Sequence, residues 1–362
     1  GLFRLFRVKT PYERRKFITD QEFHFGLIIT AHQETRFVFP LIDSILRQSY
    51  PKFHVYIVAD DCDISNLKFS DERITVLRPE PALHGKTRSI HYALSKFHRK
   101  HDAIIIFDAD NLIHPSYLEV MNRYFQKGYR VVQSNFKPKN LDTTYARMDA
   151  VGDMFNFFLE REMRIRLNLS AAIWGSGVAI EQDLYTGVQY PDALGGFDKK
   201  LQSHLTEHAG KSAFAHDAIL FDEKISSGKS LENQRTRWIN SYFKYFSESW
   251  YLLSRGILKG NTDLWYTGFI MLRLPLFMIL GSGILITIAN YFINRPLFYA
   301  WLVILASFFL AFVGIVLVMG KDLRFLRNIL SLPLLVYNQE MALFKVKTAK
   351  KSFMKPPHSR EV

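Results

Sequence analysis

The sequence predicts an α/β domain with a parallel sheet covered by helices on both faces, followed by a membrane-spanning helical hairpin. Between residues 25 and 135, short apolar runs alternate with helix-like stretches, which is typical of such a sheet. Residues 274–293 and 296–320 form two long runs without a charged side chain. A chain of 362 residues has room for both parts, because this length suggests two or three structural units.

The strands and helices of the first part follow from the apolar pattern. We expect strands at residues 25–31, 53–59, 73–77, 103–107 and 130–134, and helices at about 36–48, 86–100 and 115–127. Ligands in parallel sheets bind beyond the carboxyl ends of the strands. The residues that follow each strand are therefore the first candidates for a functional site.

Acidic residues follow three of these strands. Glu34 follows the first, Asp60 ends the second, and Asp108 and Asp110 end the fourth. A single carboxylate at a loop entry is commonly a helix cap or a turn former. Asp108 and Asp110 differ, because alternate residues at a strand end place two hard oxygen ligands beside each other. This arrangement suits Mg²⁺ or Mn²⁺ held jointly by the carboxylates and a substrate diphosphate.

Several enzyme classes lack their signatures in this sequence. There is no G-x-G-x-x-G after the first strand and no G-x-x-x-x-G-K-S/T, which disfavours dinucleotide oxidoreductases and P-loop ATPases. H-E-x-x-H and G-x-S-x-G are also absent. One cysteine, Cys62, excludes an internal disulfide framework and a Cys-rich zinc site. A metal-dependent reaction on a nucleotide-linked substrate remains.

Three later segments have both a structural and a functional interpretation. Residues 174–180 (WGSGVAI) form a small-residue turn entering a strand, where the backbone can approach a ligand closely. Asp198, in G-G-F-D, lies at a helix start and is either a cap or a general base. Residues 234–238 (QRTRW) lie on an amphipathic stretch, where arginines face lipid headgroups or clamp a diphosphate while Trp238 packs against a sugar.

The two charge-free runs are long enough to cross a bilayer as helices, although a buried hairpin of a soluble domain is the alternative. Basic residues flank both ends of the pair, whereas the short turn between them carries only Arg295. The positive-inside rule then places both flanks in the cytosol. Residues 329–337 and the basic tail after them indicate an interfacial segment on anionic lipid. We prefer lipid to nucleic acid as the partner of this tail and of the net charge of +13.

The order of these motifs is far more specific than any single motif. D-A-D comes first, a G-F-D helix start follows, and Q-R-T-R-W precedes the membrane hairpin. Over about residues 24–340 the chain resembles the membrane-integrated family 2 glycosyltransferases, the cellulose, hyaluronan and chitin synthase group and its bacterial relatives. The resemblance implies a GT-A domain and an inverting transfer from a nucleotide-activated sugar, with UDP donors favoured.

The resemblance also implies roles for individual residues. Asp60 matches the aspartate that contacts the nucleotide base, Glu34 lies in the first-strand motif, and Lys86 matches a lysine near the diphosphate. The remaining matches are the metal pair Asp108 and Asp110, the Q-x-x-R-W residues Gln234, Arg235, Arg237 and Trp238 over the donor and the acceptor end, and the acceptor-side turn Gly175, Ser176 and Gly177.

This sequence departs from the family pattern at the catalytic base. The family usually has the base in the motif T-E-D, whereas this chain has G-F-D, so the resemblance assigns the base role to Asp198. Leu201 and the Ala209-Gly210 pair keep the alignment with the family pattern. Loss of the glutamate is expected to alter acceptor positioning.

The expected protein is thus an integral membrane enzyme of a bacterial inner membrane, with its catalytic domain and C-terminus in the cytosol. It would extend a β-linked polysaccharide; the alternatives are single-sugar transfer to a lipid or short glycan and a non-catalytic membrane scaffold. For a polysaccharide synthase we also expect partner membrane subunits. The expected divisions are residues 1–23 (basic flank after a missing span), 24–228 (GT-A domain), 229–263 (interfacial region), 264–320 (two spans) and 321–362 (interfacial segment and tail).

Overall fold

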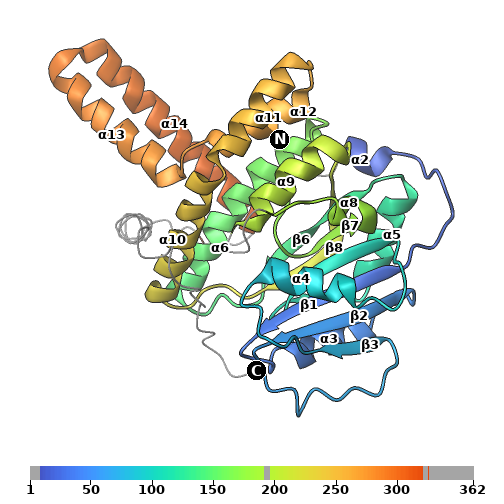
Figure 1. Cartoon of the computed structure of the whole chain (residues 1–362). Coiled ribbons are helices and arrows are strands. Elements are labelled where there is room, and N and C mark those ends of the chain that lie inside the picture. The colour runs from blue at the N-terminus through green and yellow to red at the C-terminus, as the bar shows by residue number, and fades with distance from the viewer. Residues whose placement is uncertain (1–8, 191–195, 321–324, 326–362) are drawn as a thin grey trace.

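The computed structural model describes residues 9–190, 196–320 and 325. The first part of the expected basic flank, the interfacial segment at 329–337 and the basic tail lie outside the described residues. The rest forms a layered α/β domain from which two long helices project (Figure 1).

An eight-stranded sheet in the order β3-β2-β1-β4-β7-β6-β8-β5 forms the centre of the domain. Strands β1, β2, β3 and β4 are parallel, as the sequence predicted, but β7 is antiparallel to both β4 and β6. The sheet is therefore mixed, because the chain passes through α6 and α7 and enters β7 from the opposite end. The strands are β1 (Phe25–His32), β2 (Phe53–Asp60), β3 (Ile74–Leu77), β4 (Ala103–Asp108), β5 (Leu112–Ile113), β6 (Val131–Pro138), β7 (Val178–Glu181) and β8 (Ala213–Asp222).

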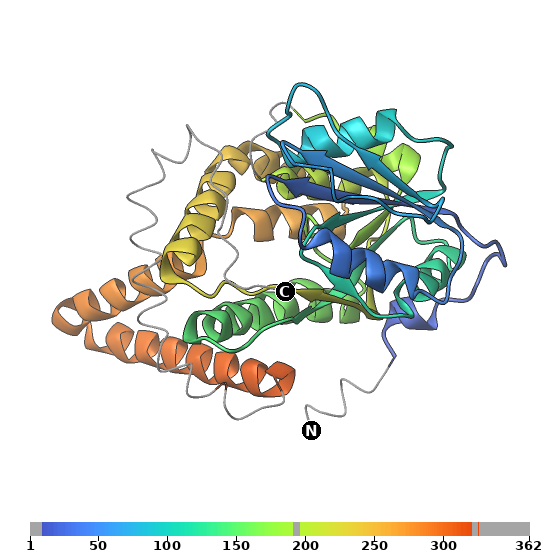
Figure 2. The same cartoon turned by 90° about the horizontal axis from the view of Figure 1, so that it is seen from below.

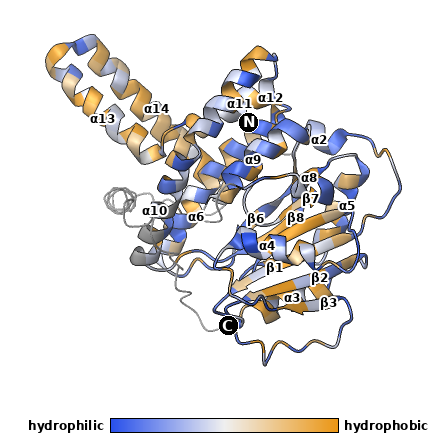
Figure 3. Cartoon of the chain, in the orientation of Figure 1, coloured by the Kyte–Doolittle hydropathy of each residue, from blue (hydrophilic) through white to orange (hydrophobic). Residues whose placement is uncertain are grey.

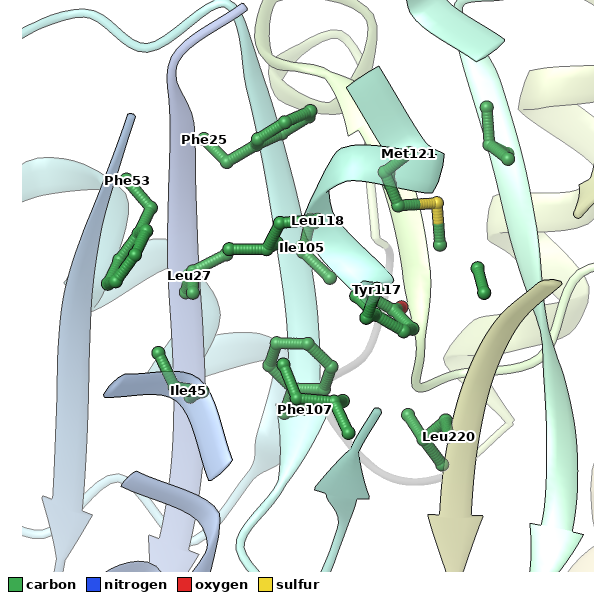
Figure 4. Close-up of a cluster of buried hydrophobic side chains, with 14 of the residues drawn as sticks. Phe25, Leu27, Ile45, Phe53, Ile105, Phe107, Tyr117, Leu118, Met121 and Leu220 are labelled. Carbon is green, nitrogen blue, oxygen red and sulfur yellow. The ribbon is translucent and has the colours of Figure 1, made fainter. Parts of the chain in front are cut away.

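Helices cover both faces of the sheet. On one face, α3 (Val38–Leu46) and α5 (Tyr117–Gln126) pack against alternate strand residues such as Leu27 and Ile105 (Figure 4). On the other, α4 (Lys86–Ser95), α8 (Gln182–Thr186) and α9 (Phe197–His208) cover the intervening residues, such as Ile28 and Ile104. Burial on both faces explains why these strands are continuously apolar. The predicted strands and helices are confirmed with shifted ends; α4, for example, ends at Ser95.

A second group of helices joins the domain to the projecting pair. It comprises α6 (Thr144–Phe157), the π-helical turn η1 (Phe158–Glu162), α7 (Met163–Arg166), α10 (Gly228–Lys244), α11 (Phe246–Leu258) and α12 (Thr262–Leu272), while α2 (Pro11–Arg14) lies near the N-terminus. Thr143, Ser227 and Asn261 cap α6, α10 and α12 through their side-chain oxygens, as N-cap residues do. The expected interfacial region at 229–263 is thus divided among α10, α11 and the start of α12.

Helices α11 and α12 approach each other closely enough to require glycine. A Cβ on Gly256 would lie 2.1 Å from the backbone nitrogen of Trp265, and one on Gly268 would lie 2.4 Å from that of Leu253. Neither backbone atom can move aside without shifting a helix. The two glycines therefore set the spacing of this helix pair.

The projecting pair consists of α13 (Leu276–Ile293) and α14 (Arg295–Gly320), which are mostly apolar (Figure 3). Figure 2 shows α14 lying along α6, where Phe312 and Val316 pack against Val151 and Phe155. Among the described residues only α14 is long and apolar enough to cross a membrane, judged by length and composition. The apolar stretch within α13 is shorter, Met278–Ile293. One of the two expected spans is therefore supported.

Candidate active site

The metal motif lies at the carboxyl end of the parallel strands. The register pairs His32 of β1 with Asp60 and Thr30 with Asp108, so β1, β2 and β4 end at the same edge. The backbone N–H of Asp108 donates to Asn111 Oδ1 at 3.0 Å and to Ser176 Oγ at 3.2 Å. The turn of Gly175, Ser176 and Gly177 is thereby held directly against the D-A-D segment.

Asp110 lies in a strongly acidic environment. Burial raises the pKa of its carboxyl to about 8, with further contributions from the neighbouring charges of Asp222 and Asp108, whereas Lys139 opposes the shift. The carboxylates of Asp108, Asp110 and Asp222 gather hard oxygen donors of the kind that bind Mg²⁺ and Mn²⁺. The donor set of hard oxygen ligands therefore fits Mg²⁺ or Mn²⁺.

Asp222 was missed by the sequence analysis. It ends β8, and its oxygens accept hydrogen bonds from Asn111 Nδ2 at 3.2 Å and from the buried Lys224 Nζ at 2.9 Å. Lys224 also bonds to Asp153 of α6 at 2.6 Å. The signal was the carboxylate at the end of the short apolar run at 218–221, but only the pairing of β5 with β8 brings it to the D-A-D segment.

Lys86 is the first residue of α4 and lies beside the metal motif. Its Nζ is 2.5 Å from Asp108 Oδ1, and it also sits 5.5 Å from the centre of the Phe197 ring. A lysine at the N-terminus of a helix adds its charge to that of the helix end, which favours an anion. Lys86 is therefore suited to a phosphate group bound next to Asp108.

Asp198 lies in the first turn of α9, so the predicted helix start is confirmed. Gly196 precedes this helix at φ 68°, and a Cβ there would lie 2.0 Å from Ser241 Oγ of α10. A Cβ on Gly175 would lie 2.8 Å from the Phe197 ring. The start of α9 is thus packed between the glycine-rich turn and the last part of α10.

The Q-R-T-R-W segment lies in the middle of α10, before Ser241, the residue of this helix that approaches Gly196 at the start of α9. The side-chain oxygen of Gln234 is buried without a hydrogen-bond partner among the described residues, and Trp238 is 46% exposed. Arg235 and Arg237 lie in α10, but their side chains are outside the description.

Asp60 is buried rather than open at the edge. It is 2% exposed, and its oxygens accept the N–H groups of Leu83 at 2.6 Å and His84 at 2.8 Å. The side-chain ligand atoms of His32, Asp60 and His84 all lie within 4.8 Å of one another, so this group could also hold a metal ion. Glu34 is partly exposed and pairs with Arg36 at 3.4 Å. In this conformation Asp60 organises the loop before α4.

One protein-family model matches the chain. The model of the family described as "Glycosyltransferase like family 2" matches residues 23–241. No curated protein matches the chain.

Solved structures with similar folds include mannosyltransferase PcManGT from Pyrobaculum calidifontis in complex with GDP-Man and Mn²⁺ (14% identity, 84% of this chain and 93% of that chain, TM-score 0.49). TarS 1-349 from S. aureus in complex with UDP-GlcNAc is also similar (15% identity, 56% of this chain and 59% of that chain, TM-score 0.42). These scores are too low for either likeness to bear on function.

Proposed function

Because the chain belongs to the family 2 glycosyltransferases, we propose that it is an inverting, metal-dependent enzyme that transfers a sugar from a nucleotide-sugar to a growing β-linked polysaccharide at a membrane. The observation that carries this proposal is the position of Lys86, whose Nζ pairs with Asp108 and lies 5.5 Å from the ring of Phe197, the first residue of α9. Asp198 is the next residue of that helix. Metal ligands, a cation for the diphosphate and a base are the parts that such a transfer requires.

The donor end of the site would be formed by the D-A-D segment and its neighbours. Asp108 and Asp110 would hold Mg²⁺ or Mn²⁺, with Asp222 contributing its charge. Bound there, the cation would neutralise charge on the leaving nucleoside diphosphate. Lys86 would contact the same phosphates, and Arg235 and Arg237 of the Q-x-x-R-W segment would stabilise the departing diphosphate, for which UDP is the favoured carrier. Asp60 and Glu34 would lie on the nucleotide side.

The acceptor end would lie between α9 and α10. Asp198 would accept the proton of the attacking hydroxyl, and direct displacement on the opposite face of the donor sugar inverts the anomeric centre. Trp238 and the turn of Gly175, Ser176 and Gly177 would hold the acceptor, whereas Gln234, one turn before Trp238, would bind the nucleotide-sugar. Gly175 contacts Phe197, which is next to Asp198, and this contact supports an acceptor end separate from the donor end.

The membrane assignment rests on the helices after the catalytic domain. Exposed apolar side chains on α11 and α12, among them Trp250 at 53%, Leu258 at 86% and Phe269 at 56%, suit an interfacial position. Helix α14 would cross a bacterial inner membrane with α13 as its shorter partner, leaving residues 24–228 as a cytosolic GT-A domain.

A second candidate function is transfer of one sugar to a lipid or short glycan. It is favoured by the finding that, within the described part of the chain, a single helix meets the length and composition of a span. A polysaccharide channel needs several helices, which this chain would have to obtain from partner subunits.

The test is nucleotide release from a panel of UDP- and GDP-sugars by the purified protein in lipid, with Mn²⁺ or Mg²⁺, using Asp110→Asn as the control. Release from one donor, absent in the control, is the expected result. Product size then separates a polymer from a single addition. No release from any donor, together with no metal-dependent nucleotide binding, would refute the proposal and favour a scaffold.

A further inference from the structure

Arg161 is a fully buried arginine whose charge has no hydrogen-bond partner among the described residues. Its exposure is 0%, and Nε, Nη1 and Nη2 are all unpaired. Its neighbours in the same segment differ, since Arg164 donates to Thr267 Oγ1 at 2.6 Å and Arg166 pairs with Glu162 at 2.5 Å. Arg161 is therefore the exception in an arginine-rich stretch.

Such a residue does not stabilise a fold. Removing a guanidinium from water without hydrogen bonds is unfavourable, and well-packed apolar replacements of buried charges are often neutral or stabilising. Burial lowers the pKa of Arg161 to about 10, while Glu160 and Asp153 act against the shift, so the side chain stays charged at neutral pH. Arg161 also lies on the π-helical turn η1, and such turns occur frequently at functional sites.

Arg161 contacts two aromatic rings: its guanidinium carbon lies 5.7 Å from the centre of the Phe157 ring and closer to Trp174. The guanidinium carbon lies 3.9 Å from the centre of a Trp174 ring, and Phe136 meets the indole edge-on at 4.6 Å. The Trp174 backbone N–H donates to Gln133 Oε1 at 2.8 Å. The indole is thus held on one face, at an edge and through its backbone, yet the side chain remains only partly buried.

Trp174 stands next to the reacting groups. It directly precedes Gly175, which contacts Phe197 beside Asp198, and Ser176 bonds to the backbone of Asp108. A flat indole at this position can pack against the C–H face of a sugar ring. The arginine behind it would fix the plane of that ring before the substrate arrives.

We propose that Trp174 is a platform for the terminal sugar of the acceptor glycan, and that Arg161 is a positioning residue that acts through it. This proposal rests on the proposed glycosyl transfer. Arg161 does not touch the substrate; its cation–π contact preorganises the platform. The ligand class is a saccharide chain with an exposed apolar ring face.

The first experiment separates positioning from structure. Arg161→Met is expected to leave the melting temperature unchanged or higher while raising the KM for the acceptor by about tenfold more than the KM for the donor. Arg161→Lys, which keeps the charge, is expected to recover part of the acceptor KM. Arg164→Met is the matched control and should lower the melting temperature, because it breaks a buried hydrogen bond. Equal changes in both KM values, or a clear loss of stability in Arg161→Met, would overturn the proposal.

A second experiment needs no turnover. Titration of the full-length protein with tetrasaccharides of the chito-, cello- and manno- series should quench tryptophan fluorescence, and Trp174→Phe should remove the response. No response of the wild-type protein to any of the three would overturn the platform. Binding that depends on Trp174, in a protein that releases no nucleotide from any donor, would instead contradict the proposed function and leave the platform standing.

Discussion

Replacing Asp110 with asparagine is expected to stabilise the metal-free protein while removing its metal site. The pKa of Asp110 is raised to about 8 in the folded protein, against roughly 3.9 in an unfolded chain. At a pH between these two pKa values, the Asp110 carboxyl is ionised in the unfolded chain and protonated in the folded protein. Stability therefore falls as the pH rises from about 4 to about 8, and each unit costs about 1.4 kcal/mol.

At pH 7 the accumulated cost is on the order of 4 kcal/mol, and asparagine, which does not ionise, removes it. Thermal unfolding of Asp110→Asn and wild type, without metal, should show the variant more stable at pH 7.5 and the two nearly equal at pH 4. Protonation of the Asp110 carboxyl also competes with binding of the metal ion. Because the pKa of Asp110 is raised, a smaller fraction of its carboxyl is ionised at pH 6 than at pH 7.5, so the affinity of the wild type for Mn²⁺ should be weaker at the lower pH, by on the order of tenfold.

Calorimetric titration with Mn²⁺ at pH 6 and pH 7.5 checks the expected pH dependence of metal affinity, with Asp110→Asn as the control that lacks the carboxylate. A variant that is less stable than wild type at pH 7.5 would show that Asp110 is a satisfied structural carboxylate. Affinity for Mn²⁺ that is equal at pH 6 and pH 7.5, or equal in the variant, would refute the assignment of Asp110 to the metal.

Three further predictions test other parts of the site and the fold. Asp198→Asn should retain nucleotide-sugar binding and lower transfer at least about a hundredfold, and equal loss of both would indicate a structural cap. Lys86→Met should raise the donor KM by about tenfold, because the phosphates lose a cation and Asp108 loses its ion pair; an unchanged donor KM in the nucleotide-release assay would contradict this. Gly256→Ala should destabilise the α11–α12 pair by about 2 kcal/mol in thermal unfolding, whereas Gly281→Ala, with nothing within 4 Å of the new methyl group, should not.

The elements that carry the proposed chemistry were predictable where a local pattern determines them. An apolar run followed by D-A-D predicts a strand with carboxylates at its end, and β4 ends at Asp108 as expected. A glycine pair followed by Phe-Asp predicts a helix start, and α9 begins at Phe197. The rule that parallel strands present their carboxyl ends at one edge then placed Asp60 and Asp108 correctly on the same edge.

Features that depend on pairing between distant segments were not predictable in this way. The antiparallel entry of β7 and the arrival of Asp222 beside the metal motif follow from strand partners far along the chain. The same holds for Asp60, whose two oxygens are occupied by a loop that no periodicity places there.

The sequence by itself therefore determined the parallel strands β1 to β4, the placement of Asp108 at a strand end and the position of Asp198 in the first turn of its helix, because these depend on hydrophobic period and on residues close in the chain. Only the tertiary structure decided that a buried arginine stacks on Trp174 at 3.9 Å and that α10 passes the start of α9 at Gly196. These contacts depend on how helices pack on the completed sheet, and packing joins side chains whose separation in sequence carries no signal.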